Sequence, residues 1–199
     1  MGSTSPGRGR PRDPGAGRAI IGATLELLTE EGYDGVRVAQ LARRAGVSKA
    51  TLYRRWPSKA WLVVAALRST PPLEPVDTGS LREDLEALLN QFLAIFDSTP
   101  VAGLLAALAI ERCRDPSLAR SLDSFVRERR RPLVEAMQRA VARGEIPPTA
   151  DLDLAASLAG GPIVMRVLFG GATDPAAVRQ LAELVGTALG EVRIERSAC

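Results

Sequence analysis

The residues best suited to chemistry in this sequence are cations gathered in one short stretch. Between Gly35 and Ala60 there are seven arginine or lysine residues and no aspartate or glutamate. Residues 1–60 hold 11 basic and 5 acidic side chains, a net charge of +6, whereas residues 61–199 hold 15 and 18, a net charge of −3. Such a one-sided block indicates a polyanionic partner, with nucleic-acid phosphate as the obvious candidate. A solvated basic surface without a partner is the alternative.

The sequence, in contrast, lacks residues that enzyme active sites usually contain. Histidine is absent from the 199 residues, which removes the Ser–His–Asp and Cys–His arrangements and the common zinc sites. Cys113 and Cys199 form no paired metal-type spacing, which indicates free thiols in a reducing cytoplasm. The longest apolar runs, residues 60–67 and 101–110, are far shorter than the ~20 residues of a membrane span. We therefore expect a cytoplasmic protein that is no enzyme, spans no membrane and needs neither metal nor cofactor.

The elements that must position the cations are predicted to be helices throughout. Only 4% of the residues are aromatic, while alanine, leucine, arginine and glutamate recur, a balance that favours an all-α fold. Residues 1–17 are rich in glycine, proline and serine, so we expect a disordered basic arm there. Its cations Arg8, Arg10 and Arg12 either follow a DNA minor groove or stay solvated.

The helices fall into two groups on either side of a proline-rich break. The stretch Ser69–Gly79 contains three prolines and marks a domain boundary. The first domain, residues 18–67, is expected to hold helices over about 18–31, 37–45, 49–56 and 58–67. The second domain, residues 68–199, is expected to hold longer helices over about 80–96, 101–114, 116–143, 151–169 and 174–194.

The segment Val38–Trp56, VAQLARRAGVSKATLYRRW, has the pattern of a helix-turn-helix. Such a motif needs a small residue where its two helices cross, which Ala42 provides. It needs a turn residue that tolerates positive φ, which Gly46 provides. The helices must also be locked together by apolar side chains, and this segment supplies Leu41, Ala45, Val47 and Leu52. These features occur together inside the acid-free basic block, so the segment predicts a DNA-binding domain of three helices.

At this point the chain resembles the tetracycline-repressor (TetR) family. The run AGVSKATLYRRWPSKAWL resembles the family signature, and the preceding helix with GYDGVRV is similar to the family's first helix and turn. The resemblance is strong over about Arg18–Leu67 and continues to the C-terminus as helical layout only. It implies a regulator that binds a palindromic operator as a dimer and leaves it when a small molecule enters the C-terminal domain.

The resemblance also implies roles for individual residues of the second helix of the motif. Lys49, Thr51 and Tyr53 match positions that face the major groove in the family. Arg54 and Arg55 are neighbours of these positions and reach either guanine or phosphate, two alternatives that the sequence leaves open. Tyr53 has two expected roles: its ring packs against the protein, or its hydroxyl contacts a phosphate.

Residues around that helix complete the expected DNA-binding set. Ser48 is in the capping position at its start. Lys59 lies where the family usually places a phosphate contact. Arg37 stands where the family often has a capping Ser or Thr, so we expect a weaker cap and a possible phosphate contact there. Trp56 is expected in the core or at a hinge rather than on a base.

The C-terminal domain is expected to supply both a dimer interface and a ligand pocket. The last two helices, about 151–169 and 174–194, are apolar on broad faces, which fits a four-helix homodimer interface or ordinary intramolecular core. A pocket for an unknown small-molecule effector, apolar or amphipathic, would lie among the three helices before them. Its candidate lining residues, each equally explained as plain core, are Phe92, Phe96, Leu105, Leu108, Phe125 and Met137.

The sequence therefore predicts a ligand-responsive transcriptional regulator, most simply a repressor, with double-stranded operator DNA as its partner. The alternative is a helix-turn-helix activator or architectural protein without an effector, which would need no cavity. An enzyme with an accessory DNA-binding domain is disfavoured, because no nucleophile elbow, phosphate loop or paired metal ligands occur in the sequence.

Overall fold

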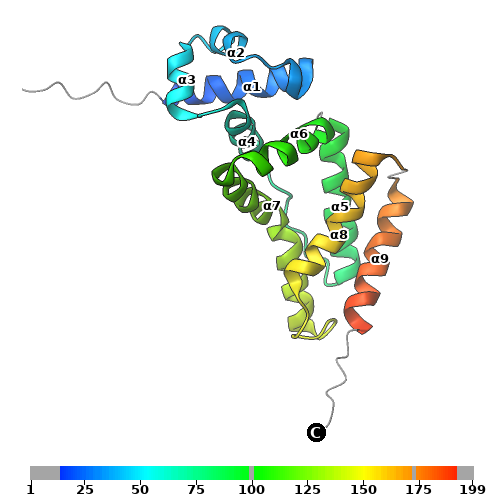
Figure 1. The fold of residues 1–199 in the computed structure, drawn as a ribbon. Coiled ribbons are helices and arrows are strands. Elements are labelled where there is room, and N and C mark those ends of the chain that lie inside the picture. Colours follow the sequence, from blue (N-terminus) through cyan, green and yellow to red (C-terminus); the bar gives the residue numbers. More distant parts are fainter. Residues whose placement is uncertain (1–13, 99–100, 172–173, 192–199) are drawn as a thin grey trace, which may run out of the picture. The chain divides into compact units, whose positions relative to one another are not determined.

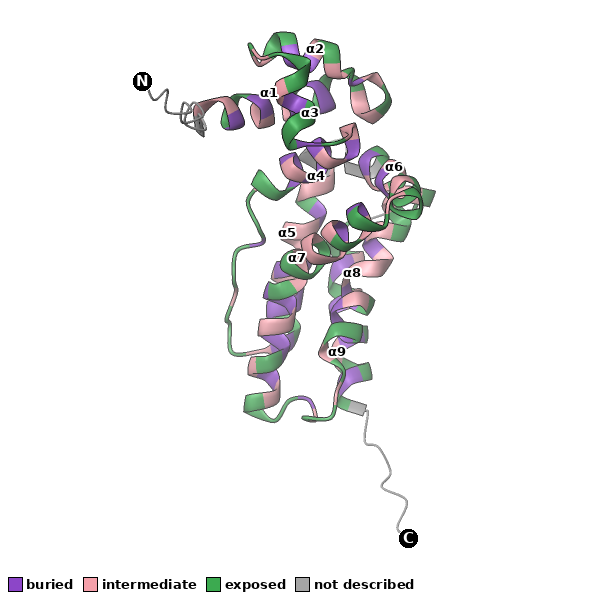
Figure 2. Cartoon of the chain, turned by 60° about the vertical axis from the view of Figure 1, so that its left-hand side comes forward, coloured by how far each residue is buried: buried purple, intermediate pink, exposed green. Residues whose placement is uncertain are grey.

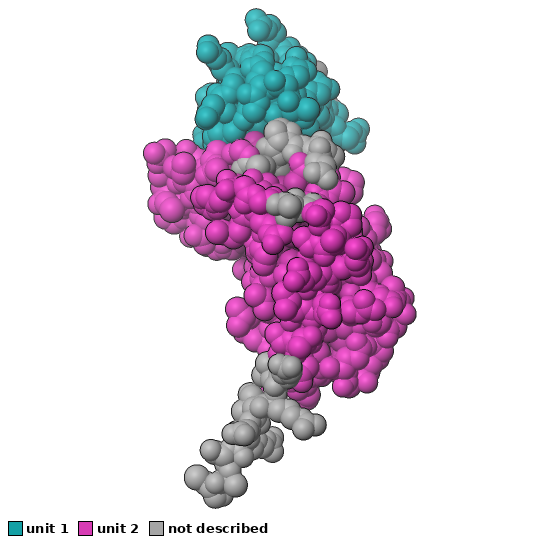
Figure 3. Space-filling model, turned by 90° about the vertical axis from the view of Figure 1, so that its right-hand side faces the viewer, with its two compact units in different colours: residues 1–69 teal, residues 70–199 magenta. Residues whose placement is uncertain are grey.

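The computed structural model describes residues 14–98, 101–171 and 174–191, and every regular element within these ranges is an α-helix (Figure 1). The all-α expectation is therefore confirmed. The chain divides into two compact units, residues 1–69 and 70–199 (Figure 3). The division lies two residues beyond the expected boundary, because the fourth helix continues to Ser69 before the prolines begin.

The first unit contains four helices: α1 (Pro14–Gly35), α2 (Val38–Arg44), α3 (Lys49–Arg55) and α4 (Lys59–Ser69). Their apolar faces meet in a small core whose fully buried members are Ile20, Leu27, Leu28, Leu41, Leu52, Val63 and Val64 (Figure 2). Helix α1 contains a kink at Gly32, whose φ of 68° only glycine adopts readily. The sequence pattern placed the end of the first helix at this point.

The start of α1 corrects one expectation. Residues 14–17 were expected in a disordered arm, yet they form the first turn of the helix. Two glycines made this turn look unfavourable, but proline is well suited to the first position of a helix because its missing N–H would have no partner there. Arg8, Arg10 and Arg12 lie outside the described residues.

The second unit is a helical bundle built around α5 (Leu81–Ser98). This helix packs against each of the other four: α6 (Val101–Arg114), α7 (Pro116–Arg143), α8 (Leu152–Phe169) and α9 (Pro175–Glu191). The core contains buried side chains of α5, α7, α8 and α9, among them Leu85, Leu88, Met137, Ala156 and Ala182. Capping side chains fix the helix starts: Asp115 accepts from two backbone N–H groups of α7, and Asp151 accepts from Leu154 N.

The segment Thr70–Ser80 forms an extended strap that begins where α4 ends and runs to α5. Side chains of the bundle hold it in place. Arg129 of α7 donates to the carbonyl and hydroxyl oxygens of Thr70 at 2.7 and 2.8 Å. Gln91 of α5 forms two hydrogen bonds with the backbone of Glu74. The backbone of the strap thus forms hydrogen bonds with side chains instead of those that a helix or strand would provide.

A buried charge anchors the second half of the strap. Asp84 is completely buried and accepts from the backbone N–H of Thr78 at 2.6 Å. Its other carboxylate oxygen lies 3.6 Å from Arg139 of α7, which also donates to the carbonyl of Val76. Leu73 is buried in the bundle core. A buried carboxylate needs such a cation nearby, so the ion pair and the strap support each other.

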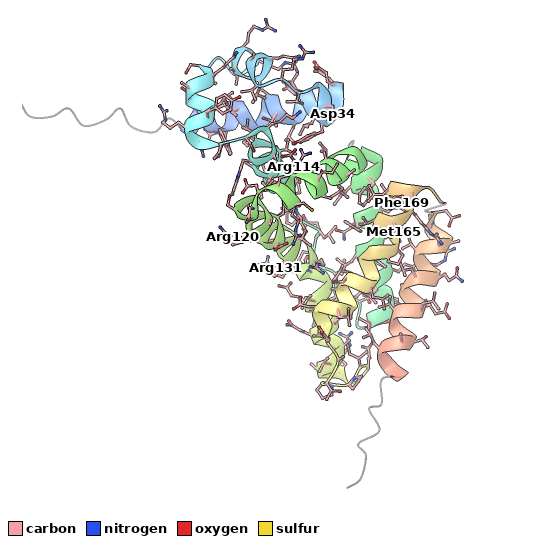
Figure 4. The ribbon with its side chains drawn as sticks, viewed as in Figure 1. Asp34, Arg114, Arg120, Arg131, Met165 and Phe169 are labelled. Carbon is pink, nitrogen blue, oxygen red and sulfur yellow. The ribbon has the colours of Figure 1, made fainter. Side chains whose placement is uncertain are left out.

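Helix α8 differs from the other helices in how much apolar surface it exposes. Leu154, Leu158, Met165 and Phe169 are all exposed and recur at helical spacing, forming an exposed apolar stripe. Figure 4 labels Met165 and Phe169 on this helix. By length and composition this helix could cross a membrane, although one such helix is weak evidence. The sequence analysis did not expect this, because Asp153 and Arg166 interrupt the apolar run. The stripe calls for a protein or lipid surface to cover it.

Candidate nucleic-acid interface

The turn between α2 and α3 has the geometry that the sequence predicted. Gly46 has a φ of 65°, and an added Cβ would meet nothing within 4 Å, so backbone conformation rather than space requires glycine there. Val47 N donates to the carbonyl of Ala42 at 2.9 Å and closes the turn. Leu41 and Leu52 are fully buried, and α2 packs against both α1 and α3.

Two hydroxyls define the start of α3. Ser48 has extended backbone angles and its Oγ accepts from Thr51 N at 3.2 Å, as a capping residue should. The hydroxyls of Ser48 and Thr51 lie 3.0 Å apart. In the structure both side chains therefore stabilise the helix start, while their contacts with DNA stay a prediction.

One face of α3 is exposed and cationic. Lys49 and Tyr53 are one helical turn apart, Arg54 lies roughly opposite the buried Leu52, and all three side chains are exposed. The side chain of Tyr53 remains 51% exposed despite its size. Within the part of the chain that the structure describes, these three side chains have no hydrogen-bond, ion-pair or ring partner. We call Lys49, Tyr53 and Arg54 the open face of α3.

Arg55 behaves differently from Arg54, although the sequence treated the two as equivalent. Its guanidinium lies 4.7 Å from the ring centroid of Trp56, which is itself buried as expected. A Cβ added to Gly17 would lie 2.5 Å from Arg55 Nη1, so the guanidinium rests against the first turn of α1. Arg55 is thus held by its own unit, whereas Arg54 has no such contact among the described residues, and a base contact by either arginine stays a prediction.

Two further cations of the predicted set are Lys59, the first residue of α4, and Arg37, the N-cap residue of α2. Lys59 is half-buried: its Nζ donates to the carbonyl of Tyr33 at 2.8 Å and lies 4.2 Å from the centroid of that ring. An ammonium has three donors, so a phosphate contact stays compatible with this arrangement. Arg37 is exposed in the N-cap position of α2, and its side chain forms no capping hydrogen bond. The sequence suggested this, because Arg37 stands where the family often has Ser or Thr.

The candidate set omitted the two arginines at the end of α2, and the structure separates them. Arg44 forms an ion pair with Glu30 of α1 at 2.9 Å. Arg43 is exposed and has no partner among the described residues. Arg43 therefore joins the candidate phosphate contacts. Its place in the acid-free block was the available signal, but the sequence alone did not show which arginine α1 neutralises.

The structure also places the six residues expected to line a ligand pocket. Phe92 and Phe96 of α5 are half-buried and pack edge to face with 5.1 Å between ring centroids. Met137 has no exposed surface and belongs to the bundle core. Leu108 of α6 is buried, whereas Leu105 and Phe125 are half-buried. A pocket lined by this set stays a prediction, and the two hollows found in the second unit are lined by other residues.

An exposed cationic helix, set on a platform of two others by a glycine turn, defines a helix-turn-helix DNA-binding protein. The family model described as "Bacterial regulatory proteins, tetR family" matches residues 20–66. The model "Tetracyclin repressor-like, C-terminal domain" matches residues 75–185. The chain therefore belongs to the TetR family of transcriptional regulators, as its sequence resemblance suggested.

Individual relatives support the same assignment. The uncharacterized HTH-type transcriptional regulator YdeS of Bacillus subtilis is 35% identical over 170 residues, which cover 82% of this chain and 84% of YdeS. The DNA-binding transcriptional repressor TetR of Mycobacteroides abscessus is 30% identical over 171 residues, which cover 83% and 88% of the two chains. Among solved structures, the TetR family transcription regulator SCO0332 aligns with a TM-score of 0.72 and 30% identity, covering 86% of this chain and 97% of its own.

Proposed function

We propose that this chain is a cytoplasmic, ligand-responsive repressor that binds a palindromic operator as a homodimer and leaves it when a small apolar or amphipathic effector binds residues 70–199. The open face of α3 is the observation that carries the proposal. The three exposed side chains belong to an acid-free basic block, and such a concentration of positive charge attracts a polyanion. In an operator complex Arg54 would donate to guanine, and Lys49 with the hydroxyl of Tyr53 would meet bases or phosphates.

Footprinting tests the DNA-binding part of this proposal. The purified protein is incubated with DNA fragments flanking its own gene, and the protected region is expected to contain an inverted repeat. Tyr53→Ala should abolish or strongly weaken the protection, whereas Arg114→Ala, which removes an exposed cation from α6, should leave it unchanged. An asymmetric single site would contradict the dimer, and normal protection by Tyr53→Ala would contradict the docking of α3.

The exposed apolar stripe on α8 supports the homodimer. Leu184 of α9 is also exposed, and a hollow of about 200 Å³ between α8 and α9 gives this surface relief into which a second copy can pack. Leu158→Glu should therefore convert the dimer to a monomer in analytical ultracentrifugation. Ile110→Glu is the matched control, because Ile110 is similarly exposed but belongs to α6. Dimers of equal stability in both variants would refute this interface.

The effector separates this proposal from the alternative of an activator or architectural protein without a ligand. A thermal-shift screen of apolar and amphipathic compounds identifies candidates, since a ligand that binds only the folded protein raises its unfolding temperature. Each candidate is then added to the protein–operator complex in a gel-shift assay. Release of the DNA supports a ligand-responsive repressor. A complex that no stabilising compound releases favours the alternative.

A further inference from the structure

A second hollow of about 350 Å³ lies between α7 and α8, next to Leu154 of the exposed apolar stripe. Arg130 of α7 forms part of its lining and is two-thirds or more buried. Its Nη1 donates to the hydroxyl of Ser157 on α8, and that hydroxyl donates in turn to the carbonyl of Asp153 at 2.8 Å. The Nε of Arg130 is buried and has no hydrogen-bond acceptor among the described residues.

A comparison with Arg139 shows that this environment is unusual. Arg139 also has a buried Nε without a hydrogen bond, but the carboxylates of Asp84 and Asp77 lie 3.6 and 3.5 Å away. No carboxylate in the described part of the chain lies within ion-pair distance of Arg130. A guanidinium that is largely removed from water and offset only by a neutral hydroxyl destabilises the fold. The arrangement is explained if an anion from outside the chain completes it.

The other groups around the hollow indicate which anion fits. Arg127 lies one turn before Arg130, is exposed and has no partner in the described residues, so it adds a second positive charge. Asp123 is already paired with Arg112 at 2.9 Å. Asp153 keeps an unpaired carboxylate at the rim, which repels a dianion more strongly than a monoanion. The exposed side chains of Val126 and Leu154 offer apolar walls for a hydrocarbon group.

We infer that this hollow binds a small organic monocarboxylate. Its two oxygens accept from the guanidinium of Arg130, whose planar fork of donors matches the geometry of a carboxylate. The hydrocarbon part of the ligand lies against Val126 and Leu154. That this ligand acts as an effector rests on the proposed function, but its binding does not, so binding is measured on the full chain in the absence of DNA.

Isothermal titration tests the site with sodium salts of the straight-chain acids from acetate to octanoate and with benzoate. The neutral amides of the same acids and inorganic phosphate serve as comparison ligands. We expect saturable binding of one or more carboxylates, with the matching amide and phosphate weaker by about tenfold or more. Arg130→Gln should reduce carboxylate affinity by a similar factor. Arg130→Lys should give an intermediate loss, because it keeps the charge but not the planar fork.

Arg131→Gln is the matched control. Arg131 follows Arg130 on α7, its side chain is 74% exposed, and it pairs only with Glu135 at 3.4 Å, so this variant should bind the carboxylates as the unaltered chain does. The proposal is overturned if no carboxylate saturates at millimolar concentration, if phosphate binds as tightly as the best carboxylate, or if folded Arg130→Gln or Arg130→Lys binds with unchanged affinity. It is also overturned if Arg130→Gln dissociates the dimer without affecting carboxylate binding, since a second copy would then supply the acceptor.

Discussion

Arginine side chains in the two units have opposite surroundings. In the first unit, Arg54 on α3 is exposed and has no partner among the described residues. In the second, Arg129 and Arg139 of α7 donate to backbone carbonyls of the strap and hold it against the bundle. Both regions are rich in arginine, so the density of cations does not reveal a nucleic-acid site. Lys49 and Arg54 on the open face of α3 differ from these two arginines because they have no acceptor among the described residues.

The largest expected effect comes from the core that supports the open face. Leu52→Ala should destabilise the first unit by about 2–5 kcal/mol, because loss of the fully buried leucine side chain leaves a cavity on the buried side of α3, which packs against α2. Denaturant unfolding followed by circular dichroism should then show an early transition for the first unit and an unchanged one for the second. A single transition shared by both units would show that their stabilities are not independent.

The next effect separates the two neighbouring arginines of α3. Arg54→Ala should weaken operator binding by about 1–3 kcal/mol without lowering thermal stability, because the side chain is exposed and has no partner among the described residues. It should also reduce the dependence of log affinity on log salt concentration by about 0.9 if Arg54 meets phosphate, and change base preference if it meets guanine. Arg55→Ala should instead lower the unfolding temperature through the lost contact with Trp56. Equal behaviour of both variants in both assays would remove the distinction.

A smaller effect is expected at the strap. Arg129→Ala removes the donors to Thr70 and should cost about 1–2 kcal/mol of stability, since hydrogen bonds from a charged donor are lost at a partly exposed site. Amide hydrogen exchange should become faster in residues 70–76 while the core of α5 stays protected. Arg131→Ala, on the same helix but away from the strap, provides the control. Unchanged exchange in the strap would mean that Leu73 and Gln91 hold it without Arg129.

The smallest effects should distinguish Arg43 from Arg44. Arg44→Ala removes an exposed ion pair with Glu30 and should change stability by only about 0.2–1 kcal/mol. Arg43→Ala should leave stability unchanged and slightly reduce both operator affinity and its salt dependence. Thermal unfolding and binding titrations at two salt concentrations measure these differences. A stability loss in Arg43→Ala would show that this side chain has a partner within the fold.

The sequence allowed much of this architecture to be predicted because its helices carry local signals. Gly46, Ser48 and the prolines after Ser69 act on the backbone next to them, so the turn, the cap and the strap boundary follow from residue type. The start of α1 was predicted too late in the chain, since Gly15 and Gly17 have low helix propensity and Pro14 was not recognised as a favourable first residue of the helix. Within the site, the exposed positions of α3 followed from helical periodicity together with the family resemblance.

The parts that escaped prediction depend on contacts between residues distant in the chain. Helical periodicity sets Arg54 farther than Arg55 from the buried Leu52, but only the folded first turn of α1 reveals the surface on which Arg55 rests. The ion pair of Arg44 with Glu30 joins residues 14 positions apart, and the pairing of Arg130 with Ser157 joins residues 27 positions apart. Such pairings are set by the packing of whole helices, which periodicity alone does not determine.

Helix α3 has only seven residues, and this brevity limits how much information one subunit can read. At 1.5 Å per residue it is about 10 Å long, roughly the rise of three base pairs of duplex. A sequence of three base pairs recurs throughout any genome, where competing sites number in the millions. Selection of one promoter must then come from two such three-base-pair sequences at a fixed separation. The side chains that set the distance between two copies of α3 would thus determine which promoter is bound as much as the side chains that contact its bases.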